Sequence, residues 1–186
     1  MDYREELQAY QPVNEQEAKD KEVTLSYLSC FGDNLLTREN EFAHFSASSM
    51  IFNKERTKVL MAFHNIYNSW SWTGGHADGE RDFLALAMRE AMEETGVSSL
   101  TPITAQMASI EILPVWGHMK RGKYVSSHQH INFSYLLEAD ESEALKVKED
   151  ENSAVGWIEI DKLLDYVSEP EMLPIYNKLI DQAKKR

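Results

Sequence analysis

The sequence has one cysteine, Cys30, no tract rich in proline, glycine and serine, and no long apolar run. A single cysteine excludes an internal disulfide and a metal site built from several thiolates, and we expect Cys30 to be a small buried apolar residue. The longest apolar run, Phe83–Met88, is six residues long, whereas about 20 are needed to cross a bilayer. The first residues also lack the apolar segment of a signal peptide. We therefore expect a cytoplasmic protein.

Basic residues are scarce relative to acidic ones. Lysine and arginine number 19 against 31 aspartates and glutamates, which gives a formal net charge of −12. This charge argues against a nucleic-acid polymer or an anionic membrane as the partner. It is compatible with a small anionic substrate, because a bound divalent metal can invert the local field. The composition therefore leaves small phosphorylated compounds as partners.

The length of 186 residues, with 42% hydrophobic and 27% charged residues, predicts one globular domain with an addition. Apolar spacing and a stop at Gly32 predict a helix over residues 14–31. We expect residues 1–40 to form an N-terminal helical extension packed on a domain of residues 41–186. The same helix is suited to a homodimer contact, so the sequence leaves the oligomeric state open.

The rest of the chain alternates between strand and helix patterns. Strands are expected at residues 45–52 and 57–63, joined by a turn at 53–56, and again at 107–115, 129–138 and 155–158. Helices are expected over 82–95 and from 161 onward. This order predicts an α/β or α+β fold in which helices flank a mixed sheet.

The helix over 82–95 is bounded by Asp82 as N-cap and by Gly96 after its last residue. Helical geometry places its apolar residues on one arc, which we expect to face the sheet: Leu84, Ala87, Met88, Ala91, Met92 and Thr95. Three glutamates share the edge of this arc: Glu90, Glu93 and Glu94.

These three acids do not stabilise the helix by themselves. Like charges at i,i+4 cost roughly 0.2–0.5 kcal/mol per pair, and the helix dipole disfavours acids near the C-terminal end. A hard divalent cation such as Mg²⁺ would explain the cluster, because it prefers oxygen ligands and bridges carboxylates to phosphates. The alternative is a solvated charged face, and an ion pair of Arg89 with Glu93 fits both interpretations.

The residues around the glutamates resemble the Nudix hydrolase signature, G-x5-E-x7-R-E-U-x-E-E-x-G-U, where U is aliphatic. The matching positions are Gly75, Arg89, Glu90, Glu93, Glu94, Gly96 and Val97. Six identities at roughly 7% usage each match by chance on the order of 10⁻⁷ times per starting position. Two positions depart from the pattern: Arg81 stands where it has glutamate, and Ala91 is smaller than usual. Glu80 or Asp78 could take the place of the missing carboxylate, or the metal site could be plainer than is usual for the pattern.

The resemblance extends beyond this segment. Residues 44–48, 70–72 and Trp157 are similar to a bacterial Nudix subgroup that carries an N-terminal helical segment. The resemblance implies a Nudix-type α/β/α sandwich with a mixed sheet, in which the signature forms a loop, a helix and a loop.

The resemblance also implies a reaction, in which water attacks phosphorus and cleaves a diphosphate linked to another group, with Mg²⁺ or Mn²⁺ as cofactor. It implies Glu90, Glu94 and Glu93 as metal ligands, together with the carbonyl of Gly74. Catalytic roles fall on Glu93, Glu90 and on Arg89, which would orient the glutamates. The general base stays open among four acids: Glu93, Glu111, Glu149 and Glu151.

The substrate-binding residues are less specific in the sequence. His44, His128 and His130 could contact phosphates or a base, Arg121 lies in a basic run at 120–123, and Trp72 could stack on a base. The alternatives are ordinary sheet-face histidines, a solvated loop and core packing.

The substrate itself stays open among ADP-ribose-like sugars, damaged nucleoside triphosphates and dinucleoside polyphosphates. The main hypothesis is an enzyme for a nucleotide or a nucleoside-diphosphate compound. The competing hypothesis is a catalytically weak Nudix-fold module for nucleotide binding or regulation.

Overall fold

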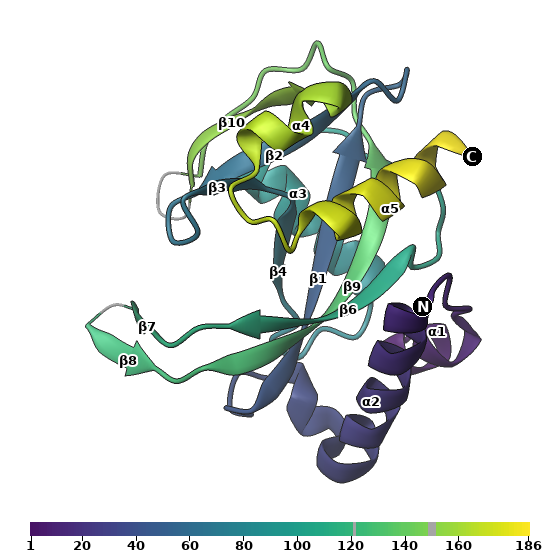
Figure 1. The fold of residues 1–186 in the computed structure, drawn as a ribbon, viewed down its shortest axis with the longest axis vertical. Coiled ribbons are helices and arrows are strands. Elements are labelled where there is room, and N and C mark those ends of the chain that lie inside the picture. The colour runs from purple at the N-terminus through teal and green to yellow at the C-terminus, as the bar shows by residue number, and fades with distance from the viewer. Residues whose placement is uncertain (121, 149–151) are drawn as a thin grey trace.

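The computed structural model describes residues 1–120, 122–148 and 152–186 (Figure 1). In this part of the chain the main sheet is mixed and is built around a parallel pair, β1 (Ala43–Phe52) and β9 (His128–Glu138). The antiparallel neighbours on the β1 side are β2 (Lys58–His64), β3 (Ser69–Ser71), β4 (Thr73–His76) and β10 (Asn152–Glu159). On the β9 side they are β5 (Thr101–Pro102) and β6 (Ser109–Val115). A separate hairpin pairs β7 (His118–Lys120) with β8 (Lys123–Val125).

The turn between β1 and β2 forms where the sequence predicts it. The side-chain oxygen of Asn53 accepts hydrogen bonds from the backbone N–H groups of Thr57 and Lys58, each at 2.9 Å. Asparagine is favoured in such turns because its short side chain can satisfy nearby backbone donors. This hairpin, and the predicted strands around 107–115, 129–138 and 155–158, are confirmed.

Helix α3 (Phe83–Thr95) lies behind the sheet in the view of Figure 1, where the sequence predicts a helix. The Asp82 carboxylate accepts from the N–H of Ala85 at 3.1 Å, and Gly96 ends the helix in the left-handed region at φ 77°. One predicted core contact is wrong: Met92 is exposed, and Glu94 is buried in its place. Phe83 and Leu86 pack among the rings of the core on this side, and they set the rotation of the helix.

The opposite face of the sheet is covered by the C-terminal segment. It contains η2 (Ile160–Lys162), α4 (Leu163–Tyr166) and α5 (Leu173–Lys184), and α5 lies in front of the sheet in Figure 1. Tyr176 and Leu179 of α5 pack with Met50 and Phe52 of β1. The sheet is therefore sandwiched between helices, in the α/β/α arrangement expected from the sequence.

The N-terminal segment packs against β6 and against the core on the α3 side of the sheet. It comprises α1 (Tyr3–Ala9), α2 (Glu15–Phe31) and η1 (Gly32–Leu36). Tyr3 and Leu7 are fully buried in the core on the α3 side. The backbone of β6 bonds to α2, since the N–H of Ile112 donates to Asp20 at 3.1 Å. The helix predicted at 14–31 is confirmed, whereas α1 was not predicted.

Cys30 is exposed, so the expectation of a buried thiol is wrong. It lies near the end of α2, where its direct neighbours Ser29 and Phe31 are also exposed. None of the helices in the described ranges is both long enough and apolar enough to span a membrane. The division of the chain at residue 40 stays a proposal.

Candidate functional site

The loop after β4 and the second half of α3 line a pocket of about 840 Å³. Gly74 and Gly75 contribute from β4, and Arg89, Glu90 and Glu93 from α3. The glycines are needed because the backbone of β4 runs directly against the helix. A Cβ atom at Gly75 would lie 2.5 Å from Cδ of Glu90, closer than carbon atoms approach one another.

Glu90 is the most enclosed acid that lines this pocket from α3. Its side chain is 16% exposed, and the nearest atom of the Arg89 guanidinium is 3.5 Å from its carboxylate. Burial, followed by repulsion from Glu93, raises the pKa of Glu90. Two neighbouring carboxylates held in this way attract a cation.

Glu94 connects α3 to two strands. One carboxylate oxygen accepts from the N–H of Gly74 at 2.9 Å, and the other accepts from the Asn152 side chain at 2.9 Å. The side-chain oxygen of Asn152 is buried and has no hydrogen-bond partner among the described residues. Glu94 also lines a smaller adjoining pocket of about 180 Å³. It therefore fixes β4 and β10 relative to the other two glutamates.

Glu93 differs from both in being half exposed. Nε of Arg89 lies 3.9 Å from its carboxylate and Nζ of Lys148 lies 3.7 Å away. The pairing of Arg89 with Glu93 predicted from the i,i+4 spacing is present, at a separation typical of a solvated pair. Arg89 thus contacts both Glu90 and Glu93.

Arg81, which stands at the position of the expected glutamate, binds the N-terminal segment. Its guanidinium donates to Asp2 at 2.7 Å and to Asp33 at 2.8 Å, and its carbonyl accepts from the N–H of Tyr3 at 3.0 Å. The Asp33 carboxylate accepts hydrogen bonds from Arg4, Tyr3 and Arg81, which together lower its pKa. Arg81 therefore links the loop before α3 to the N-terminal segment.

The two acids expected to replace the missing glutamate have other partners. One oxygen of Glu80 accepts from the backbone N–H groups of Arg81 and Asp82, and the hydrogen bonds lower the pKa of Glu80. Asp78 lines the large pocket and forms a two-bond ion pair with Arg38 at 2.8 and 2.5 Å.

The predicted histidines come together at the rim of the same pocket. His44 of β1 and His130 of β9 are paired across the parallel ladder, and His128 lies two residues before His130. His76 of β4 joins them, with its Nε2 atom 3.2 Å from that of His130. His76 was not predicted, and the pairing of β4 with β1 is the feature that brings it here. Only the sheet register could have identified it.

The remaining predicted residues are more dispersed. The Trp72 ring packs edge-on against Tyr176 at 5.4 Å and lines the smaller pocket. Glu111 is buried in β6, 3.0 Å from Nζ of Lys178, and is absent from the described lining of the large pocket. Three predicted residues, Arg121, Glu149 and Glu151, lie outside the described residues.

Comparisons with known proteins identify the family of the chain. The family model described as NUDIX domain matches residues 42–181. The RNA pyrophosphohydrolase of Pelagibacter ubique is 28% identical over 141 residues, which cover 73% of this chain and 88% of that protein. A Lactococcus lactis protein named "Probable DHNTP pyrophosphohydrolase" is 29% identical over 105 residues, which cover 56% of this chain and 60% of that protein.

A solved structure supports the fold. The MutT protein from Methanosarcina mazei superposes with a TM-score of 0.58 at 16% identity, over 79% of this chain and 99% of that one. The match of the family model spans most of the chain and contains the whole glycine and glutamate frame of β4 and α3. The chain therefore belongs to the Nudix family of hydrolases.

Proposed function

We propose that the chain is a divalent-metal-dependent Nudix hydrolase that cleaves a diphosphate bond in a small nucleotide or nucleoside-diphosphate-linked compound. The observation that carries the proposal is the position of Glu90 and Glu93 in one pocket, against Gly74 and Gly75, within a matching Nudix domain.

Membership of the family, together with two relatives named as pyrophosphohydrolases, makes this chain a Nudix pyrophosphohydrolase. Nudix hydrolases act on nucleotide-linked compounds and generally need a divalent metal. For this chain, the metal, the roles of the residues and the substrate class are proposed.

The oxygen donors in the pocket fit Mg²⁺ or Mn²⁺. Glu90 and Glu93 of the large pocket, together with Glu94 of the adjoining smaller pocket, would hold the metal, with the carbonyl of Gly74 as a further ligand, because hard divalent cations prefer carboxylate and carbonyl oxygens. Burial and the charge of Glu93 raise the pKa of Glu90. This supports the assignment, because a bound cation would stabilise the ionised Glu90 carboxylate against both effects. When bound, such an ion neutralises phosphate oxygens and lowers the pKa of water.

The protein groups have separate tasks in this proposal. Arg89 contacts Glu90 and Glu93, at 3.5 and 3.9 Å, and holds them in position. Glu93 is the favoured general base among the described acids, because it is half exposed in the pocket and can reach a water molecule. Glu111 is disfavoured because its carboxylate is bonded to Lys178, Ser109 and Ser134.

The substrate's remaining group would lie elsewhere in the large pocket. Its lining includes the positive charge of Lys120, the guanidinium of Arg38 in its ion pair with Asp78, and the aromatic rings of Tyr67 and Tyr124. Such a lining suits phosphates and a base. Together with the net charge of −12, it favours a small compound over a nucleic-acid polymer.

The test is a panel of nucleoside-diphosphate derivatives, nucleoside triphosphates and dinucleoside polyphosphates, assayed with Mg²⁺, with Mn²⁺ and with EDTA. We expect turnover that requires the metal and that falls at least about 100-fold in Glu90→Gln, as expected when an electrostatic group of a reaction site is removed. Glu22→Gln, on the surface of α2 and paired with Lys19, is the matched control and should retain full activity. Full activity in Glu90→Gln or in EDTA would contradict the proposal.

A second function, nucleotide binding without catalysis, is favoured by one observation, the replacement of the expected glutamate by Arg81. Calorimetry on the same panel separates the two. If a compound of the panel binds but no product forms with either metal, the result would support a binding module and would contradict the proposed hydrolase activity.

A further inference from the structure

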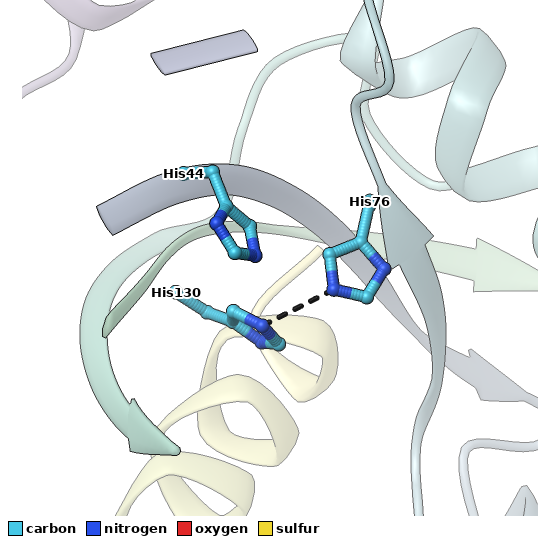
Figure 2. A group of neighbouring side chains, drawn as sticks. All are labelled: His44, His76 and His130. Carbon is cyan, nitrogen blue, oxygen red and sulfur yellow. Dashed lines mark hydrogen bonds between the residues drawn. The ribbon is translucent and has the colours of Figure 1, made fainter. Parts of the chain in front are cut away.

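Three strands bring histidines together at one end of the sheet. His44 lies in β1 opposite His130 of β9, and His76 of β4 is paired with Ser46 of β1. Because side chains two residues apart on a strand share a face, His44, His76 and His130 all lie on one face. Figure 2 shows their rings pointing toward one another.

The ring nitrogens lie at the distances of metal ligands. One nitrogen from each of His44, His76 and His130 can be chosen so that all lie within 4.8 Å of one another, and Nε2 of His76 is 3.2 Å from Nε2 of His130. Ligands of a tetrahedral zinc ion lie about 3.3 Å apart, since each zinc–nitrogen bond is about 2.0–2.1 Å long. One pair is thus already spaced for a shared ion.

His44 presents an unpaired nitrogen to this cluster. Its Nδ1 lies 3.1 Å from the carbonyl oxygen of Asn40, which can only accept, so Nδ1 carries the proton and Nε2 carries a lone pair. That Nε2 atom is buried and has no hydrogen-bond partner in the part of the chain that the structure describes. Histidines that bind metals commonly donate their other N–H to a backbone carbonyl in this way. A buried lone pair without a donor is otherwise costly.

We propose that His44, His76 and His130 form a binding site for one transition-metal ion of the zinc type, separate from the glutamates of α3. Imidazole nitrogens suit Zn²⁺, Co²⁺ and Ni²⁺, whereas Mg²⁺ prefers the oxygens of Glu90 and Glu93. Three protein ligands leave a fourth position for water or another oxygen, the pattern of zinc sites that take part in chemistry. The three histidines and the two glutamates line the same pocket of about 840 Å³.

The experiment is calorimetric titration of the full, chelator-treated chain with ZnCl₂ in excess Mg²⁺. We expect one Zn²⁺ per chain, and with Co²⁺ the visible absorption of a low-coordinate nitrogen site. His76→Asn and His130→Asn should each weaken Zn²⁺ binding at least about 100-fold, more than the loss of an outer-shell partner. Circular dichroism checks that both variants fold.

Two controls locate the ion. His118→Asn removes a histidine that lines the same pocket, with its Nδ1 on the carbonyl of Trp116, and should bind Zn²⁺ as the parent does. Glu90→Gln should also leave Zn²⁺ binding unchanged while it abolishes Mg²⁺-dependent hydrolysis, so this proposal and the proposed function fail separately. The proposal is overturned if Zn²⁺ does not bind, if both histidine variants bind it normally, or if Glu90→Gln removes it. If neither variant folds, the absence of the Co²⁺ absorption in the parent chain overturns it.

Discussion

At the scale of single residues, the position of the Glu90 carboxylate depends on the lack of a side chain opposite it. Gly75 is in contact with Glu90, so any Cβ atom at residue 75 would overlap the carboxylate. Gly74 has a related role, because its N–H donates to Glu94 and a Cβ there would lie 2.7 Å from the carbonyl oxygen of Ala47. Two consecutive glycines thus let β4 lie close to both acids.

We therefore predict that Gly75→Ala lowers the turnover of the best substrate at least about 10-fold, since small displacements in a reaction site are costly, while the chain stays folded. Gly156→Ala is the matched control: its new Cβ would lie 3.6 Å from the Trp70 ring, an ordinary contact. Steady-state kinetics and thermal unfolding of the two variants check this. Equal activities would show that the spacing of Gly75 and Glu90 does not matter.

At the scale of elements, the N-terminal segment is attached to the loop that precedes α3. Arg81 joins Asp2 and Asp33 in one ion-pair cluster, and Tyr3 stacks on Phe83 of α3 with ring centroids 5.2 Å apart. The ion pairs are exposed, and pairs of this kind contribute little individually, so the buried ring of Tyr3 provides most of the attachment. Arg81 then determines where α1 lies along the loop.

We predict that Arg81→Glu, which restores the residue of the Nudix pattern, speeds amide hydrogen exchange in residues 3–9 and does not raise turnover. The reason is that a glutamate at residue 81 would face Asp2 and Asp33, and like charges repel. Arg81→Lys keeps the charge and should show a smaller change in exchange. A rise in metal-dependent turnover in Arg81→Glu would instead show that the missing glutamate limits catalysis.

The elements near the site follow from local patterns, and the contacts between them do not. Alternation of apolar residues predicts β9, and Asp82 and Gly96 predict the ends of α3, because each signal is contained in a few neighbouring residues. The short strands β3 and β4 were not predicted, since their pairing depends on residues that lie far away in the sequence.

The site shows the same limit. The spacing of Glu90, Glu93 and Glu94 predicts a shared helix edge, but only the packed core reveals that Glu94 is buried and Glu93 is half exposed. The proximity of His76 to His44 depends on the pairing of β4 with β1, and the role of Arg81 depends on the position of α1. Neither leaves a signal in the local sequence.

At the scale of the whole molecule, a buried ion-pair cluster joins the N-terminal segment, the sheet and the C-terminal helix. Nζ of Lys178 in α5 lies 2.7 Å from Glu17 of α2 and 3.0 Å from Glu111 of β6. Glu17 is fully buried and also accepts from Tyr10 and from the N–H of Val13. The cluster holds three parts of the fold against one another, since removing one partner of a buried pair leaves an uncompensated charge.

We predict that Glu17→Gln lowers the free energy of unfolding by about 2 kcal/mol near neutral pH, because bonds to a charged acceptor are lost. Glu15→Gln, an exposed change in the first turn of the same helix, should stay within about 0.5 kcal/mol. Urea unfolding followed by circular dichroism measures both.

The effect of Glu17→Gln should depend on pH. Burial raises the pKa of Glu17, but hydrogen bonds from Lys178, Tyr10, Val13 and Ser109 outweigh it and hold the pKa below its usual value of 4.5. A lowered pKa in the folded state means that the stabilisation is fully present above pH 4.5 and is lost as the pH falls through the folded value. Burial also raises the pKa of Glu111, and there it outweighs the hydrogen bonds, so the pKa of Glu111 lies above its usual value. The difference between parent and Glu17→Gln should therefore shrink below pH 4.5, and a constant difference would contradict this account.

The two central strands change character along their length on the face opposite α3. In β1 this face carries His44, Ser46 and Ser48 and then Met50 and Phe52, and the last two lie in the core beneath α5. One continuous strand therefore contributes side chains both to the site and to the hydrophobic core. Substitutions in the first half of such a strand can change which compound binds, whereas the second half must stay apolar to keep the sheet packed against α5. The number of residue types that are tolerated should therefore change midway along the strand.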